Sequence, residues 1–207
     1  MEKRQIFQCS DEAAASCALV IKNGGVVVYP TDTIYGIGCD PYNDLAVKRI
    51  FTIKGRNEKK PLPVLTYSTQ NAERIVSLGR TGKTLAERYW PGALTIVAPI
   101  LDQRISSLIM ARSSSLAVRV PANNCVLMLL NHCRYLVGTS ANVSGERGLK
   151  SAQEVLDSQL EGYDALLDGG TVEKGVESTI VSVEDKPKIL REGAIKSREV
   201  SQFIGRI

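Results

Sequence analysis

Four short polar regions of this chain carry residue types that could bind an anionic ligand. They contain a lysine, several arginines, hydroxyl groups and an asparagine, and they lie at residues 30–36, 54–56, 139–145 and, together, 177–179 and 190–193. Arginine binds phosphate or carboxylate through two parallel N–H bonds, and hydroxyls and an amide add neutral donors. No cysteine, histidine or paired carboxylate is placed as a nucleophile. The pattern therefore indicates positioning and charge stabilisation, which phosphoryl and adenylyl transfer mostly require.

Each region alone also has a purely structural explanation. Thr and Asp after a strand form turns and caps, and Lys-Gly-Arg is a common way to end a helix. The residues by themselves therefore support an ATP-using or anion-binding α/β enzyme and leave its substrate open.

A sequence similar to a Walker A phosphate loop, at residues 77–84, is rejected. It ends in Gly82-Lys83-Thr84 but begins with Ser77 in place of glycine. A phosphate loop also follows a buried strand, whereas a helix is expected before this segment. We predict a turn between two helices here.

Composition limits the class of protein. The chain has 207 residues, of which 43% are hydrophobic and 23% charged, so we expect one globular α/β domain over residues 1–207. We find no apolar run that could cross a bilayer and no signal-peptide core near the N-terminus, so we expect a cytoplasmic protein with no membrane partner. The net charge of +4 is too small to indicate nucleic-acid binding by itself.

The five cysteines are odd in number and widely spaced, without a C-x-x-C pair. We expect reduced, mostly buried thiols and neither a disulfide framework nor a zinc site. The single histidine, His132, lies beside an apolar run at residues 126–130 that resembles a buried helix. We therefore predict no protein metal site and no histidine-based catalysis.

Helices and strands are expected to alternate along the chain. Ser10 can cap a helix that ends at Gly24, and Asn43 or Asp44 can begin another that ends at Gly55. Further helices are expected from residues 68, 84, 125, 151 and 197, and strands at 26–29, 62–66, 94–98, 116–120, 135–139, 165–167, 179–183 and 188–190. This order predicts a twisted sheet of parallel and antiparallel strands with flanking helices.

Seven segments in register resemble the YrdC family of threonylcarbamoyl-AMP synthases. They lie at residues 30–38, 50–56, 90–95, 117–121, 139–145, 178–181 and 190–195. The family hallmark of K-x-R followed by S-x-N is met by Lys54, Arg56, Ser140 and Asn142. The resemblance extends from about residue 10 to about residue 195.

The resemblance implies a YrdC-like fold with a basic concave cavity. It implies a nucleotidyltransferase that combines ATP, L-threonine and bicarbonate into threonylcarbamoyl-AMP and pyrophosphate. Mg²⁺ would accompany ATP, and a partner complex would use the product to modify adenosine in tRNA. Direct contact with tRNA or double-stranded RNA stays open.

The resemblance also implies a role for ten residues. Lys54 and Arg56 would be catalytic, with Lys54 beside the phosphates and the nascent carbamate. Arg56, Ser115, Ser140, Asn142 and Arg191 would hold the nucleotide. Thr33, Arg119, Thr139 and Ser178 would line the threonine pocket, with Arg119 binding the carboxylate.

Two positions depart from the family pattern. Lys60 replaces an asparagine that often contacts the nucleotide, and Leu65 replaces a histidine that often contacts threonine. These changes leave room for a paralogue with another acyl or amino-acid substrate. A non-catalytic RNA-binding module and a carbamoyl-transfer domain of the hydrogenase-maturation type also stay open.

Overall fold

A computed structural model describes residues 4–111 and 113–205. Its strands are β1 (Gln5–Gln8), β2 (Val27–Tyr29), β3 (Gly36–Gly38), β4 (Val64–Thr66), β5 (Leu94–Pro99), β6 (Ser115–Arg119), β7 (Tyr135–Val137), β8 (Thr139–Ser140), β9 (Ala165–Asp168), β10 (Thr179–Ser182) and β11 (Lys188–Arg191). Its helices are α1 (Asp11–Lys22), α2 (Asp44–Lys54), α3 (Thr69–Glu73), α4 (Gly79–Tyr89), α5 (Asn124–Cys133), α6 (Ala152–Asp157) and α7 (Ser197–Ile204). The predicted α/β class with mixed parallel and antiparallel pairing is confirmed.

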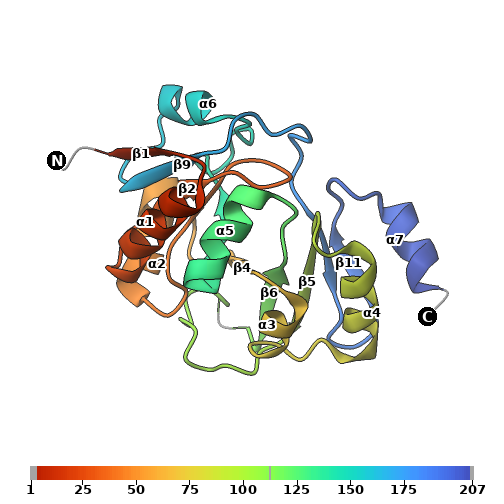
Figure 1. Cartoon of the computed structure of the whole chain (residues 1–207). Coiled ribbons are helices and arrows are strands. Elements are labelled where there is room, and N and C mark those ends of the chain that lie inside the picture. Colours follow the sequence, from red (N-terminus) through yellow and green to blue (C-terminus); the bar gives the residue numbers. More distant parts are fainter. Residues whose placement is uncertain (1–3, 112, 206–207) are drawn as a thin grey trace.

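The strands form two sheets, where the sequence suggested one. The first has the order β1-β9-β2-β3-β8, and the second has the order β11-β10-β5-β6-β4-β7. Figure 1 labels β1, β9 and β2 of the first sheet and β4, β5, β6 and β11 of the second. The chain passes from β7 in the second sheet to β8 in the first through Gly138. A Cβ atom on Gly138 would lie 2.5 Å from Cγ of Leu65, so the crossing needs a glycine. The two sheets therefore meet at this point.

Local capping signals place the helices that lead to the site. The Ser10 hydroxyl accepts from the Ala13 N–H at 3.1 Å and caps α1. Asn43 caps α2 in the same way, and Gly55 ends α2 in the left-handed conformation with φ +56°. These three predicted helix boundaries are confirmed.

Three local predictions are wrong. The polar edge strand β1 and the glycine-rich strand β3 were not expected, because neither shows an alternation of apolar and polar residues. Helix α4 begins at Gly79, so Gly82, Lys83 and Thr84 lie inside a helix and form no turn between helices.

The core occupies both faces of the first sheet. Alternate residues of β2 point to opposite faces, so Val28 packs in the larger core while Val27 and Tyr29 pack in a smaller one. The smaller core is covered by α1 and α5, which pack against each other (Figure 1). Among the described residues, no helix is long and apolar enough to span a bilayer.

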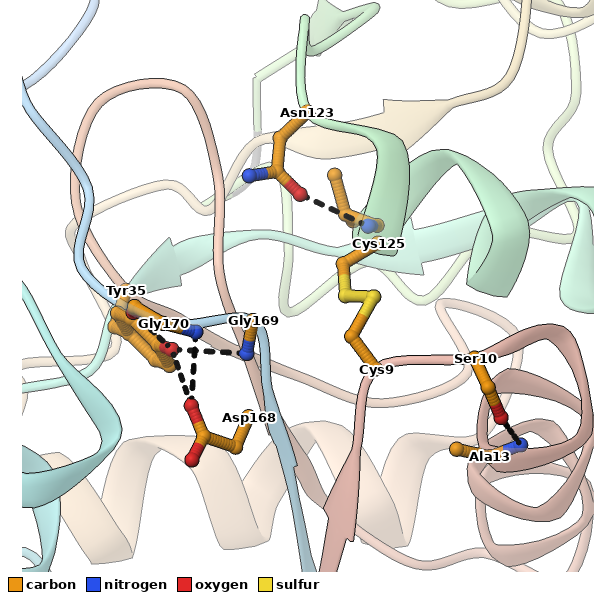
Figure 2. The surroundings of a disulfide bond; sticks show 10 residues. Cys9, Ser10, Ala13, Tyr35, Asn123, Cys125, Asp168, Gly169 and Gly170 are labelled. Atoms are coloured by element: carbon orange, nitrogen blue, oxygen red, sulfur yellow. Dashed lines mark hydrogen bonds between the residues drawn. A yellow bond between two sulfur atoms is a disulfide. The ribbon is translucent and has the colours of Figure 1, made fainter.

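The prediction that all five cysteines are reduced is wrong for two of them. Cys9 and Cys125 form a disulfide with a Cα–Cα distance of 5.8 Å. It joins the loop after β1 to the first turn of α5 (Figure 2). The partners are 116 residues apart and meet because β1 pairs with β9 while α1 packs on α5, a proximity that local spacing does not encode.

The other three cysteines are free thiols. Cys17 and Cys39 are buried and Cys133 is partly buried. Burial raises the pKa of Cys17 and of Cys133 to about 12, which keeps both protonated at neutral pH. His132 is exposed on α5, with Nε2 3.1 Å from Asp11 Oδ1, whereas Val126, Leu129 and Leu130 in the neighbouring run are buried as predicted.

Candidate functional site

A cavity of about 130 Å³ lies where segments of both sheets come together. It collects residues from the β2–β3 loop, the end of α2, β6, β8 and the β10–β11 hairpin. Seven of the ten predicted site residues line it: Thr33, Arg56, Arg119, Thr139, Ser140, Ser178 and Arg191. The fold therefore brings together polar segments that are distant in sequence.

Lys54 supports this cavity from inside the protein. The residue is only 1% exposed, and its Nζ donates to the carbonyl oxygens of Ser140 and Asn142, the latter at 2.6 Å. Burial is the main cause that lowers the pKa of Lys54, to about 8, and Arg56 adds to it while Glu177 opposes it. The last residue of α2 thus joins the K-x-R segment physically to the S-x-N turn.

Among the described residues, two buried polar atoms in the segments that Lys54 joins have no hydrogen-bond partner. Arg56 donates from Nη2 to the Pro61 carbonyl at 2.9 Å, but its Nε has no hydrogen-bond partner in the described part of the chain. The Asn142 amide nitrogen donates to Val143 O and Glu146 O, both at 2.8 Å, and within the same residues its Oδ1 is also unpartnered. Buried polar groups are normally paired, so these two atoms are unusual. Arg56 lines the cavity, whereas Asn142 does not.

Arg119 lies deep in the cavity and is almost fully buried. Its Nε donates to Gly92 O at 2.8 Å and its Nη1 donates to Thr33 Oγ1 at 3.1 Å. Its Nη2 pairs with Asp32 Oδ1 at 2.5 Å. Burial lowers the pKa of Arg119, and Asp32 opposes this effect. Asp32 thus offsets the charge of the arginine predicted to bind the threonine carboxylate.

The β10–β11 hairpin supplies the other side of the cavity. The Ser178 hydroxyl shares a hydrogen bond of 2.8 Å with Thr95 Oγ1. Arg191 donates from Nη2 to Ser178 O at 2.9 Å and pairs through Nη1 with the Glu177 carboxylate. Thr139 and Ser140 face this hairpin from β8 as cavity-lining residues.

Ser115 is not among the residues that line the cavity. It begins β6 whereas Arg119 ends the same strand, which separates the two by roughly 13 Å at about 3.3 Å per residue. Its hydroxyl donates to the Glu184 carboxylate. The structure therefore does not bring Ser115 together with the other predicted site residues.

Several contributors were missed by the sequence analysis. Thr95 and Glu177 line the cavity, and Asp32 pairs with Arg119. Glu177 and Asp32 lie in segments already singled out, but nothing in their spacing reveals that each pairs with a distant arginine. Leu65 lines the cavity, so this departure from the family pattern lies at the site, whereas Lys60 is exposed and does not line it.

The cavity combines three arginines with hydroxyl groups and a single carboxylate among the described residues. Such a set can hold a carboxylate and phosphate groups at once and stabilise charge that develops between them. The small volume favours a small molecule inside the cavity, with any larger group extending from its mouth.

Comparisons with known proteins all match this chain to one group of related proteins. The family model Sua5_yciO_yrdC, described as telomere recombination, matches residues 19–193. A threonylcarbamoyl-AMP synthase of Pyrococcus abyssi is 34% identical over 190 residues, which are 90% of this chain and 56% of that protein. A Bacillus subtilis protein of the same name is 34% identical over 96% of this chain and 58% of its own length. This chain therefore spans little more than half the length of these relatives.

A solved structure gives the same result. The crystal structure of P. abyssi Sua5 complexed with L-threonine superimposes with a TM-score of 0.91 at 32% identity. The match covers 98% of this chain and 61% of that one.

Proposed function

Because this chain belongs to the Sua5/YciO/YrdC family, we propose that it forms threonylcarbamoyl-AMP from ATP, L-threonine and bicarbonate, with release of pyrophosphate. Relatives named threonylcarbamoyl-AMP synthase support this reaction, and a relative in complex with L-threonine supports the amino acid. The observation that carries the proposal is the pair of buried atoms, Arg56 Nε and Asn142 Oδ1, which have no hydrogen-bond partner among the described residues and lie in the two segments that Lys54 joins.

The amino acid occupies the inner part of the cavity in this proposal. Arg119 binds the carboxylate, and the hydroxyls of Thr33, Thr139 and Ser178 line the pocket around it. The threonine amine attacks bicarbonate, with loss of water, or CO₂, with loss of a proton, and gives a carbamate. Leu65, which also lines the cavity, makes this wall apolar and bears on the choice of amino acid.

The nucleotide occupies the mouth. Arg56, Arg191 and Ser140, which line the cavity, hold it together with Asn142, and the buried Lys54, which bonds to the Asn142 carbonyl, contributes a positive charge. A carbamate oxygen attacks the α-phosphate and pyrophosphate leaves. The cationic groups stabilise the charge on the phosphate oxygens in that transition state.

Mg²⁺ is proposed to enter with ATP. The described residues contain no group of three or more His, Cys, Asp or Glu side chains arranged to hold a metal ion. This suits an ion held by substrate phosphates, because Mg²⁺ commonly keeps its waters and binds through phosphate oxygens. When bound, it would neutralise phosphate charge.

The product is proposed to pass to a complex that modifies adenosine in tRNA, which would place the reaction in the cytoplasm. The test is pyrophosphate release measured with each substrate omitted in turn. Release should require ATP, threonine and bicarbonate together. Equal release with serine, with alanine or without an amino acid would show that the threonine assignment is wrong.

A further inference from the structure

Glu177 is the single acidic residue among the described residues that line the cavity. The same lining contains Arg56, Arg119 and Arg191. A carboxylate in a cavity that binds phosphate opposes the binding of the ligand through like-charge repulsion. Its presence there therefore needs a physical reason.

The contacts of Glu177 tie it to one of those arginines. Its carboxylate accepts from Nη1 of Arg191, while Arg191 Nε and Nη2 donate to Ser178 O at 3.2 and 2.9 Å. The Glu177 carbonyl accepts from Ala194 N at 2.9 Å, which fixes the backbone of Glu177 as well. Both partners are thus held at one end of the β10–β11 hairpin, where Ile180 lies opposite Arg191.

The pair is accessible to solvent. The side chains of Arg191 and Glu177 are 40% and 45% exposed. Ion pairs in such surroundings contribute little to stability, so a ligand of higher charge can take over one partner. Phosphate oxygens and carboxylate oxygens are acceptors of the same kind for a guanidinium group.

We propose that Glu177 is a built-in substitute for the ligand anion: its carboxylate pairs with Arg191 in the empty cavity and releases this guanidinium to phosphate when the nucleotide binds. This inference rests on the proposed function for the identity of the nucleotide. The Arg191–Glu177 contact itself is independent of it.

The substitute anion has a clear electrostatic role. Burial lowers the pKa of Arg56, the Glu177 carboxylate opposes this shift, and the positive charge of Arg191 adds to it. Glu177 therefore offsets repulsion between the two guanidinium groups when no phosphate is present. The cavity can keep both arginines in position at the cost of a competitor for Arg191.

The test compares Glu177→Gln with the unchanged protein in equilibrium binding. The probes are inorganic tripolyphosphate and a non-hydrolysable ATP analogue, each titrated at constant ionic strength. Because the amide removes the competing charge, both probes should bind at least about threefold more tightly to Glu177→Gln. Glu173→Gln is the matched control, since Glu173 is an exposed carboxylate four residues earlier and outside the cavity lining.

A double substitution tests whether Glu177 acts through Arg191. In an Arg191→Ala background, Glu177→Gln should give no gain, because there is no guanidinium to release. Equal or weaker binding by Glu177→Gln, or a gain that persists without Arg191, would overturn the proposal. A loss of turnover with unchanged binding would also overturn it and would make Glu177 a group that acts on the reacting amine.

The tripolyphosphate arm separates this inference from the proposed function. If the unchanged protein released no threonine-dependent pyrophosphate, the assigned reaction would be wrong. Competition between Glu177 and tripolyphosphate for Arg191 would still be decided by the binding data.

Discussion

Asp32 and Arg119 form an ion pair whose side chains are only 7% and 6% exposed. Asp32 Oδ1 also accepts from the Ala122 N–H at 3.0 Å, so one carboxylate fixes both the arginine and the loop that follows β6. Lys174 Nζ lies 3.5 Å from the second oxygen. The pair is thus part of the wall behind the cavity.

Asp32→Asn should destabilise the fold, because it leaves Arg119 charged and buried without its counter-ion. Breaking a buried ion pair by removing one partner costs about 3–5 kcal/mol. Urea denaturation would measure the loss. Glu73→Gln, which breaks the solvent-exposed pair with Lys83, is the control and should cost under about 1 kcal/mol. Equal losses in the two variants would show that Asp32 does not carry this role.

Nucleotide binding should weaken as pH rises through about 8. Lys54 has a pKa of about 8 in the folded protein, so its ammonium group loses its proton above that value. Equilibrium binding of an ATP analogue between pH 6.5 and 9.5 should follow a one-proton transition. Lys54→Arg should remove that transition, because guanidinium keeps its charge throughout this range. A transition that persists in Lys54→Arg would belong to another group.

Deprotonation of Lys54 should have the opposite effect on folding: it should weaken nucleotide binding but raise the free energy of unfolding. Its pKa is lower in the folded protein than the ordinary value of 10.5, so the unfolded chain holds more protons between the two values. The contribution of Lys54 to the free energy of unfolding should therefore increase from pH 8 to about 10.5. Its destabilising effect is fully present below pH 8. The difference between the urea stability of the unchanged protein and that of Lys54→Met, followed across this range, would measure it.

Arg56→Lys should reduce threonine-dependent pyrophosphate release at least about tenfold, the effect of one lost oriented charged hydrogen bond. Lysine keeps the charge but lacks the Nε–H that is buried without a partner in the described residues. Arg80→Lys, on an exposed turn of α4, is the control and should retain full activity. An undiminished rate in Arg56→Lys would place the reacting groups elsewhere.

Thr179→Val should loosen the segment that follows Arg191. The Thr179 hydroxyl donates to Ile195 O at 2.5 Å and accepts from the N–H groups of Gly193 and Ile195 at 2.9 and 3.1 Å. Valine has a similar shape but leaves these groups unpaired, at a cost of about 1–3 kcal/mol.

Hydrogen exchange would test this directly: the amides of residues 193 and 195 should exchange faster in Thr179→Val, with a lower free energy of unfolding. Thr84→Val, on the exposed surface of α4, is the control. Unchanged protection at both amides would contradict the prediction.

Reduction of Cys9–Cys125 should lower the free energy of unfolding by about 2–4 kcal/mol, because the bridge restricts the unfolded chain over a separation of 116 residues. Denaturation with and without dithiothreitol would measure the difference. Cys9→Ser should show the lower stability in both conditions and no response to the reductant. A response that persists in Cys9→Ser would show that another group is responsible.

The sequence was informative where the signal is local. Ser10 and Asn43 cap their helices and Gly55 ends α2, because capping depends on residues within one turn. Seven predicted site residues reach the cavity because the polar segments that carry them follow helix α2 or border strands of the two sheets, which come together there. The pairs Asp32–Arg119, Glu177–Arg191 and Cys9–Cys125 were not predictable, since each depends on how distant elements pack.

The division into two sheets was missed for a similar reason. β7 and β8 are separated by one residue and read as a single strand at 135–139. At the crossing Gly138 lies against Leu65, and that contact involves a strand more than 70 residues earlier.

The two bonds from Lys54 to the carbonyls of Ser140 and Asn142 bear on protein engineering. A turn whose carbonyls are held by a buried ammonium group from another helix is not a portable module. Transplanting residues 139–145 onto a different scaffold would supply the Asn142 amide without the group that aims it. A unit moved intact would have to include at least this turn, Glu146, whose carbonyl accepts from the Asn142 amide, and the end of α2 that carries Lys54.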